Sequence, residues 1–179
     1  MPDEKLRANA IGTKVVFEKQ KENPSPTRPS IQFYKLHPEA ILPRPGTSLS
    51  VGLDLHAHLI SESGATKQIV LPPRTSRTIE TGLILLPPSG YFLMVCSRSG
   101  LAAAQPPVFV ANAPGIIDPD YTGELKVILF NGGHESVYIR HGDRIAQVLL
   151  IPAIYVDFQE ISILPQTERG SHGFGSTGR

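Results

Sequence analysis

Residues 124–153 read ELKVILFNGGHESVYIRHGDRIAQVLLIPA and contain three apolar runs separated by glycine-bearing turns. Each run has the length and composition of a β-strand, and Gly132-Gly133 between the first two predicts a hairpin. Two runs, LKVILF and VLLIPA, are almost continuously apolar. Strands of this kind are covered on both faces, so in a chain of this length they indicate burial against other subunits.

The same pattern extends back to Ile31, with Pro and Gly punctuation about every ten residues. Pro87-Pro88-Ser89-Gly90, for example, predicts a tight turn between two runs. Helix signals are few, so the sequence predicts an all-β sandwich or barrel. The predicted strands comprise residues 31–36, 49–57, 67–71, 77–86, 91–97, 107–111, 124–131, 136–140, 144–153 and 156–161.

The first part of the chain differs in composition from the rest. The stretch KQKENPSPTRPS at residues 19–30 is polar and proline-rich, and it buries too little apolar surface to order itself. We therefore expect residues 1–30 to form a flexible N-terminal extension, with a short strand at residues 14–17. The sequence leaves open whether this extension serves targeting or binds a protein partner.

The overall composition narrows the class of ligand. The 179 residues are 40% hydrophobic, which is enough for the core of one domain, and the formal net charge is +1. A near-neutral chain argues against nucleic-acid binding, so we expect a small ligand. No apolar stretch reaches the roughly 20 residues needed to span a membrane. Cys96, the single cysteine, is expected to be a buried strand residue, and we expect an intracellular protein of the cytoplasm or nucleus.

The loop GIIDPDYTGE at residues 115–124 places two carboxylates and a tyrosine between two apolar runs. Asp118-Pro119-Asp120 and Gly123 have strong turn chemistry, which by itself is compatible with an ordinary hairpin loop. A loop that carries carboxylates at the end of a strand is also a common location for an active site. The surrounding motifs favour the active site.

Four further motifs accompany this loop in a fixed order along the chain. They are VGLDLHA at 51–57, SRSGLA at 97–102, GDRIAQ at 142–147 and RGSHGFGSTG at 169–178. Together with the loop they resemble the five motifs of the trimeric dUTP pyrophosphatases (dUTPases), over about residues 31–179. The resemblance implies a distorted jelly-roll-like β-barrel at residues 31–165, a mobile C-terminal lid at residues 166–179, and a homotrimer with shared active sites.

The same resemblance implies that the chain hydrolyses dUTP to dUMP and pyrophosphate, which limits uracil incorporation into DNA and supplies dUMP for thymidylate synthesis. Asp118 would be the base that activates water for attack on the α-phosphorus. Asp120 is the competing candidate and otherwise supports the turn or an ion pair. Tyr121 would exclude a ribose by packing under the deoxyribose, although a tyrosine at a strand start also occurs for packing alone.

Other residues would bind the rest of the nucleotide. The motif around residue 98 combines a charge, a hydroxyl and a glycine that allows close backbone approach, so Arg98, Ser99 and Gly100 would contact phosphates, as would Gln147. The resemblance assigns the uracil edge to Asn112 and the backbone near Gly115 and Ile117, although Asn112 is also compatible with a plain turn residue. In the lid, Phe174 would stack on uracil, and the phosphate contacts would come from Arg169, Gly175, Ser176 and Thr177.

A divalent ion, Mg²⁺, is implied as the cofactor, held by substrate phosphates and waters without a direct protein ligand. Asp54 lies in an apolar run and needs a partner, which is either the metal-water shell or an ion pair, for example with Arg98. Asp143 and Arg144 are expected to form and hold the turn before the strand that carries Gln147.

Three departures from the family pattern stand out. Ser97 lies where proline is common, the connection at 102–113 is longer than usual, and His172 replaces a common glycine. Two alternatives to the hydrolase stay open, namely a dCTP deaminase of the same fold and a catalytically weak dUTPase-like module that regulates or binds a protein. Tyr121 and the phenylalanine in the lid favour the uracil-specific hydrolase.

Overall fold

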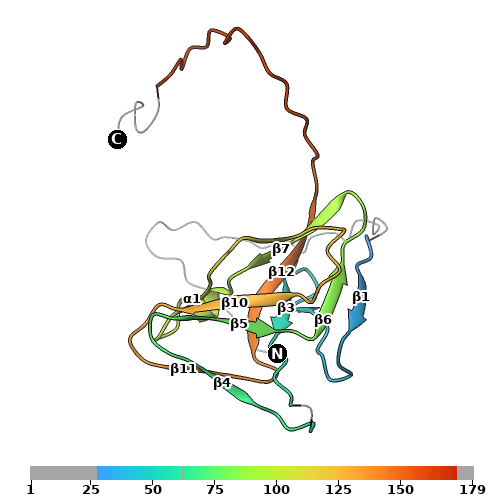
Figure 1. The fold of residues 1–179 in the computed structure, drawn as a ribbon, viewed down its shortest axis with the longest axis vertical. Coiled ribbons are helices and arrows are strands. Elements are labelled where there is room, and N and C mark those ends of the chain that lie inside the picture. The colour runs from blue at the N-terminus through green and yellow to red at the C-terminus, as the bar shows by residue number, and fades with distance from the viewer. Residues whose placement is uncertain (1–27, 62, 173–179) are drawn as a thin grey trace, which may run out of the picture.

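The structure is a computed structural model of the 179-residue chain, and it describes residues 28–61 and 63–172. The predicted strand at 14–17 and the last seven residues of the predicted lid lie outside this range. Within the described part the chain forms strands and a single-turn helix, so the all-β prediction is confirmed (Figure 1). The elements are β1 (Gln32–Lys35), β2 (Arg44–Pro45), β3 (Leu53–His56), β4 (Gln68–Leu71), β5 (Ser76–Glu80), β6 (Leu83–Leu86), β7 (Tyr91–Cys96), α1 (Ser99–Ala102), β8 (Val108–Val110), β9 (Gly115–Ile117), β10 (Lys126–Asn131), β11 (Val137–Arg140) and β12 (Arg144–Pro152). No helix in the described ranges is long and apolar enough to cross a membrane.

The largest sheet has the strand order β2-β3-β12-β7-β9, with β12 paired to both β3 and β7. Three smaller sheets pair β1 with β6, β4 with β11, and β10 with both β5 and β8. Every pairing is antiparallel. The long strand β12 therefore organises the sheet from which the candidate site is built.

One apolar core joins the sheets and is lined by fully buried aliphatic side chains such as Leu55, Leu93 and Val148. Strand β10 alternates, because Val127 and Leu129 are buried whereas Ile128 and Phe130 are only half-buried. In a single chain, one face of this apolar strand is thus left partly open. Cys96 lies in strand β7 as predicted, but it is half-buried, so the prediction that it is buried was wrong.

The hairpin predicted at Gly132-Gly133 was wrong, because β10 pairs with β5 and β8 while β11 pairs with β4. The glycines serve close packing instead. A Cβ on Gly132 would lie 2.9 Å from Phe109 Cε2, and one on Gly133 would collide with Pro106. The turn at 88–91 is present, with Tyr91 N–H donating to Pro88 O at 3.1 Å, although the strands on either side of it, β6 and β7, do not pair with each other.

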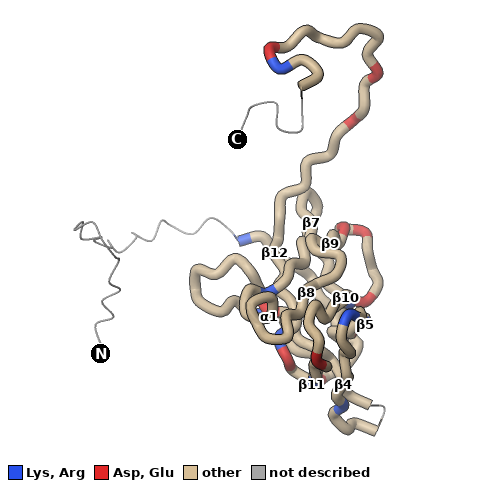
Figure 2. The backbone as a smooth tube through the Cα atoms, turned by 90° about the vertical axis from the view of Figure 1, so that its left-hand side faces the viewer, with Lys and Arg blue, Asp and Glu red and all other residues tan. Residues whose placement is uncertain are grey.

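Two strand predictions also needed correction. The run at 77–86 is interrupted at Gly82, which has a φ of +68°, and its two halves pair with different partners. Residues 156–161 form no strand and are exposed. They belong to the C-terminal arm (residues 153–172), which leaves the body after β12 and extends away from it in both views (Figures 1 and 2). The large apolar side chains of this arm are exposed, Phe158 to 98%, so residues 156–161 gain no burial that would stabilise a strand there.

Candidate active site

The central sheet brings residues of three predicted motifs to the same level. Gln147 on β12 pairs with Asp54 on β3 and with Cys96 on β7. Because Arg98 follows Cys96 by two residues, it emerges from the end of β7 beside Asp54. The register of β12 therefore explains how motifs about 90 residues apart meet.

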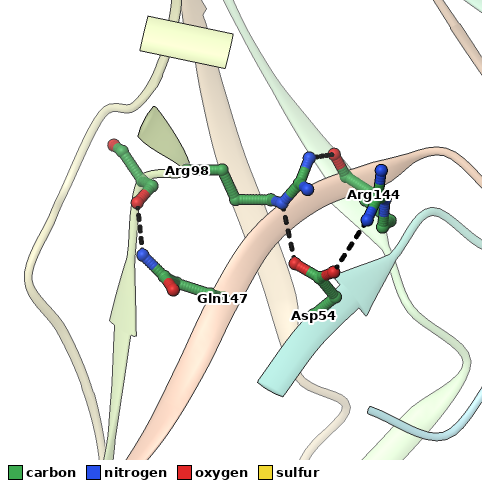
Figure 3. Close-up of polar contacts among 5 residues, drawn as sticks. Asp54, Arg98, Arg144 and Gln147 are labelled. Carbon is green, nitrogen blue, oxygen red and sulfur yellow. Dashed lines mark hydrogen bonds and ion pairs between the residues drawn. The ribbon is translucent and has the colours of Figure 1, made fainter. Parts of the chain in front are cut away.

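Asp54 is the centre of a cluster that joins two arginines (Figure 3). Arg98 Nε donates to Asp54 Oδ1 at 2.7 Å, and Arg144 Nη1 donates to Asp54 Oδ2 at 3.2 Å. Arg98 Nη1 also donates to the carbonyl of Arg144 at 3.2 Å. Of the two expected partners of Asp54, the ion pair with Arg98 is therefore present. Such an anchored guanidinium keeps its remaining N–H groups for an anion.

Gln147 and Ser97 form a second contact in this region. Gln147 Nε2 donates to Ser97 O at 3.0 Å, while Ser97 Oγ accepts from Val110 N at 2.9 Å. The hydroxyl thus ties the end of β7 to β8, a bond that proline could not make. Gly52 leaves room for this arrangement, because a Cβ there would collide with the Gln147 amide.

Ser99 and Gly100 begin the one-turn helix α1 and are both exposed. A Cβ on Gly100 would meet nothing within 4 Å, so the space before this backbone is open. This segment is therefore accessible from solvent.

The loop that carries the two carboxylates follows β9, which pairs with β7 through Gly115 opposite Val95 and Ile117 opposite Leu93. Asp118 and Asp120 are exposed in the turn after this strand. Asn112 lies against the start of β9, since its Nδ2 is 3.3 Å from the Cβ position of Gly115. Strand β9 was missed as a strand because it has only three residues.

Tyr121 lies in the same loop and is 45% exposed. Its hydroxyl donates to Glu124 O at 3.1 Å, and its ring lies over Gly123. Glu124 is in turn held by Gly82 N, which donates to Oε1 at 2.8 Å, and by Lys126 Nζ, 3.2 Å from Oε2. The sequence identified Tyr121, but the roles of Gly123 and Glu124 in holding its ring were not predicted.

The predicted residues form separate groups in one chain. Asp118 follows the residue opposite Leu93, whereas Arg98 lies beyond the other end of β7. At about 3.3 Å per extended residue, these side chains start on the order of 15 Å apart or more. Arg169 lies on the C-terminal arm, where its Nε donates to His172 O at 3.2 Å. A single copy does not bring all three to one place.

His56, also on β3, was not among the predicted residues. Its Nδ1 is buried without a hydrogen-bond partner among the described atoms. Burial lowers the pKa of His56, as do Arg144, Arg98 and Arg44, while Asp54 opposes them. The imidazole beside the arginines is therefore biased toward its neutral form, which avoids a third positive charge.

The group near this cluster that could contact a cation is the Asp54 carboxylate, which already forms ion pairs with two guanidinium groups. No group of three or more His, Cys, Asp or Glu side chains in residues 28–61 and 63–172 has the arrangement of a metal site. Free lone pairs on Asp54 suit contact with a metal-bound water better than a protein cage for the ion.

Comparison with known proteins adds to this geometry. The dUTPase family model matches residues 38–178. A deoxyuridine 5′-triphosphate nucleotidohydrolase of Ehrlichia canis is 43% identical over 139 residues, covering 76% of this chain and 86% of that protein. Its counterpart in Helicobacter pylori strain J99 is 40% identical over 148 residues, which cover 83% of this chain and 96% of that protein. Among solved structures, a mutant dUTPase of Staphylococcus bacteriophage 80alpha with dUpNHpp has the same fold, with a TM-score of 0.71 at 23% identity over 84% of this chain and 99% of that one.

Proposed function

The chain belongs to the dUTPase family and hydrolyses dUTP as a dUTP diphosphatase, and we propose that Asp118 is the base of this reaction. A water oxygen bonds to the α-phosphorus while its proton passes to the Asp118 carboxylate. The bond from the α-phosphorus to the bridging oxygen breaks, so pyrophosphate leaves and dUMP remains. The exposure of Asp118 at the end of β9 supports this role, because a base must reach water and substrate together.

One observation carries the assembly of the site: Asp118 and Arg98 start on the order of 15 Å apart or more on the same strand pair. A base and a phosphate-binding arginine so separated cannot serve one α-phosphate within a single copy. We therefore propose a homotrimer in which each site combines the Asp118 loop of one copy with the Arg98 cluster of another. The half-buried face of β10 and the exposed apolar side chains of the C-terminal arm support burial between copies.

The Arg98 cluster would bind the phosphates. Asp54 and the carbonyl of Arg144 fix the direction of the Arg98 guanidinium, and Gln147 holds the backbone at Ser97. The next two residues, Ser99 and Gly100, add a hydroxyl and amide donors. Fixed donors stabilise the charge that develops on the phosphates without reorganisation during the reaction.

The loop around β9 would bind the nucleoside. The Asn112 amide and the backbone near Gly115 and Ile117 offer the donors and acceptors that a uracil edge requires. Tyr121 would pack under the deoxyribose and exclude a 2′-hydroxyl. Asp120 would support the turn.

Residues 166–179 would act as a lid over residues 31–165. Arg169 belongs to the C-terminal arm, which extends away from the body (Figures 1 and 2), and this supports closure over a site on another copy. The lid's further contacts would come from Phe174, Gly175, Ser176 and Thr177, and closure would exclude water.

Mg²⁺ would be held by the substrate phosphates and waters, with Asp54 accepting a hydrogen bond from a metal-bound water. When bound, the ion neutralises phosphate charge. We also propose that the sheets close into the family's jelly-roll-like barrel, and that the enzyme acts inside the cell, where it limits uracil incorporation into DNA and supplies dUMP for thymidylate synthesis.

Pyrophosphate release from dUTP, UTP, dTTP and dCTP with Mg²⁺ tests the proposal. We expect hydrolysis of dUTP alone, and strong loss in a chain that ends before Arg169. Sedimentation of the full chain should give three copies. Ammonia release from dCTP would instead identify a deaminase, and a stable monomer with full activity would contradict the shared site.

A further inference from the structure

Tyr121 needs support that its own position does not supply. It lies outside any strand, and its backbone N–H donates to Asp118 O at 3.2 Å. Its side chain is 45% exposed, so packing within one chain leaves the ring free to choose among rotamers. A ring that excludes one hydroxyl group has to be held at a defined depth.

The Tyr121 ring packs directly against the backbone of Gly123. A Cβ at position 123 would lie 2.6 Å from Cζ and 2.9 Å from Cε2 of Tyr121, and closer still to the hydroxyl. The backbone at Gly123 is not in the left-handed region, so the conformation itself would accept alanine. The need for glycine therefore comes from the ring above it.

The carbonyl of Glu124 fixes the outer end of the ring by accepting the Tyr121 hydroxyl at 3.1 Å. This carbonyl belongs to a segment that is itself tightly held. The Glu124 carboxylate accepts from Gly82 N at 2.8 Å, and Leu125 N donates to Leu83 O at 2.8 Å. In addition, the buried Thr81 hydroxyl donates to Leu125 O at 2.6 Å. The support of the ring is thus anchored to the link between β5 and β6.

We propose that Gly123 and the main chain of Glu124 are specificity-positioning residues, which form a seat that sets the depth of the Tyr121 ring and hence the discrimination between deoxyribose and ribose nucleotides. The inference rests on the proposed contact between Tyr121 and the sugar. A methyl on residue 123 would displace the ring from this depth. The deoxyribose of dUTP would then lose its fitted packing surface, and the 2′-hydroxyl of UTP would no longer meet the ring in the same place, so the difference between dUTP and UTP would shrink.

The test compares kcat/KM for dUTP and UTP in four single variants and one double variant. In Gly123→Ala we expect the dUTP/UTP ratio to fall at least about tenfold, mainly through a higher KM for dUTP. Tyr121→Phe keeps the ring over Gly123 and loses one hydrogen bond, so the ratio should fall only about threefold. Gly46→Ala is the matched control, because its Cβ would meet only Ser50 Oγ at 3.9 Å. It should keep the wild-type ratio.

Tyr121→Ala separates the seat from the role of the ring. If the ring excludes ribose, the preference for dUTP over UTP disappears in this variant. Adding Gly123→Ala to it then has no further effect, because no ring remains to be displaced. If Tyr121→Ala loses the ratio while Gly123→Ala keeps it within twofold, the seat is refuted and the role of Tyr121 stands. If Tyr121→Ala itself keeps the ratio, both ideas are refuted. An equal effect of Gly123→Ala with and without the ring would also overturn the seat.

Discussion

Replacing Asp54 removes the acceptor that orients Arg98 beside the proposed phosphate site. The 2.7 Å bond from Arg98 Nε is the shorter contact, and the two side chains are only 19% and 22% exposed. The contact with Arg144 is longer, at 3.2 Å, and Arg144 is 56% exposed. Loss of the hydrogen bond from Arg98 should therefore account for most of the stability that is lost when Asp54 is replaced.

The size of the effect follows from these exposures. A charge-assisted hydrogen bond contributes about 1.5–3 kcal/mol, and partial exposure places this pair near the lower end. The Arg144 contact adds about 0.5 kcal/mol or less because solvent screens it. For Asp54→Ala we expect the free energy of unfolding to fall by about 2 kcal/mol, and for Asp54→Asn by about 1 kcal/mol, since the amide oxygen can still accept a neutral bond. The released guanidinium should raise KM for dUTP about tenfold, which corresponds to roughly 1.4 kcal/mol.

Urea unfolding at equal protein concentration and steady-state kinetics over a Mg²⁺ series measure both effects. Glu135→Gln, which removes an exposed carboxylate away from the cluster, serves as the control and should change neither quantity. If Asp54→Ala leaves the unfolding free energy within about 0.5 kcal/mol and KM within twofold of wild type, the reasoning that Asp54 orients Arg98 is refuted.

Three further predictions concern other parts of the structure. Burial, followed by two neighbouring imidazoles, lowers the pKa of His58, so the unfolded chain binds its proton more readily and stability should fall as the pH drops below about 6.5. Urea unfolding of His58→Gln should show a smaller loss between pH 7 and 5, and an unchanged pH slope would refute this. Gly52→Ala should displace the Gln147 amide and raise KM for dUTP about tenfold, which kinetics would contradict if KM stayed at the wild-type value. Asn131→Ala should cost about 3 kcal/mol in urea unfolding, because the buried amide satisfies three backbone groups, and a loss below about 1 kcal/mol would count against that role.

The sequence predicted strands better than it predicted their partners. Apolar composition and turn residues located most strands, because these are local properties. Pairing depends on contacts between distant segments, and Gly132-Gly133 shows the difference. A glycine pair is compatible both with a hairpin and with close packing against another segment, here residues 106–109, and sequence alone does not separate the two. Residues 156–161 have strand composition but pair with no strand in the part of the chain that the structure describes.

The sequence likewise predicted some features of the candidate site and not others. Asp54 was expected to need a partner because it lies in an apolar run, and Arg98 is that partner. The seat of Tyr121 could not be predicted, because Gly123 had already been explained as a turn residue. The space below the ring becomes visible only when the side chain is placed. The distance between Asp118 and Arg98 likewise requires the register of β7 with β9.

Single-turnover pyrophosphate release from dUTP by Asp118→Asn tests the central claim most directly, with the affinity for dUTP measured alongside. The asparagine keeps the size of the side chain and loses the proton acceptor, so we expect release to slow about 10²–10⁴-fold while the affinity stays within a few-fold of wild type. Release within tenfold of the wild-type rate would contradict the assignment of Asp118 as the base.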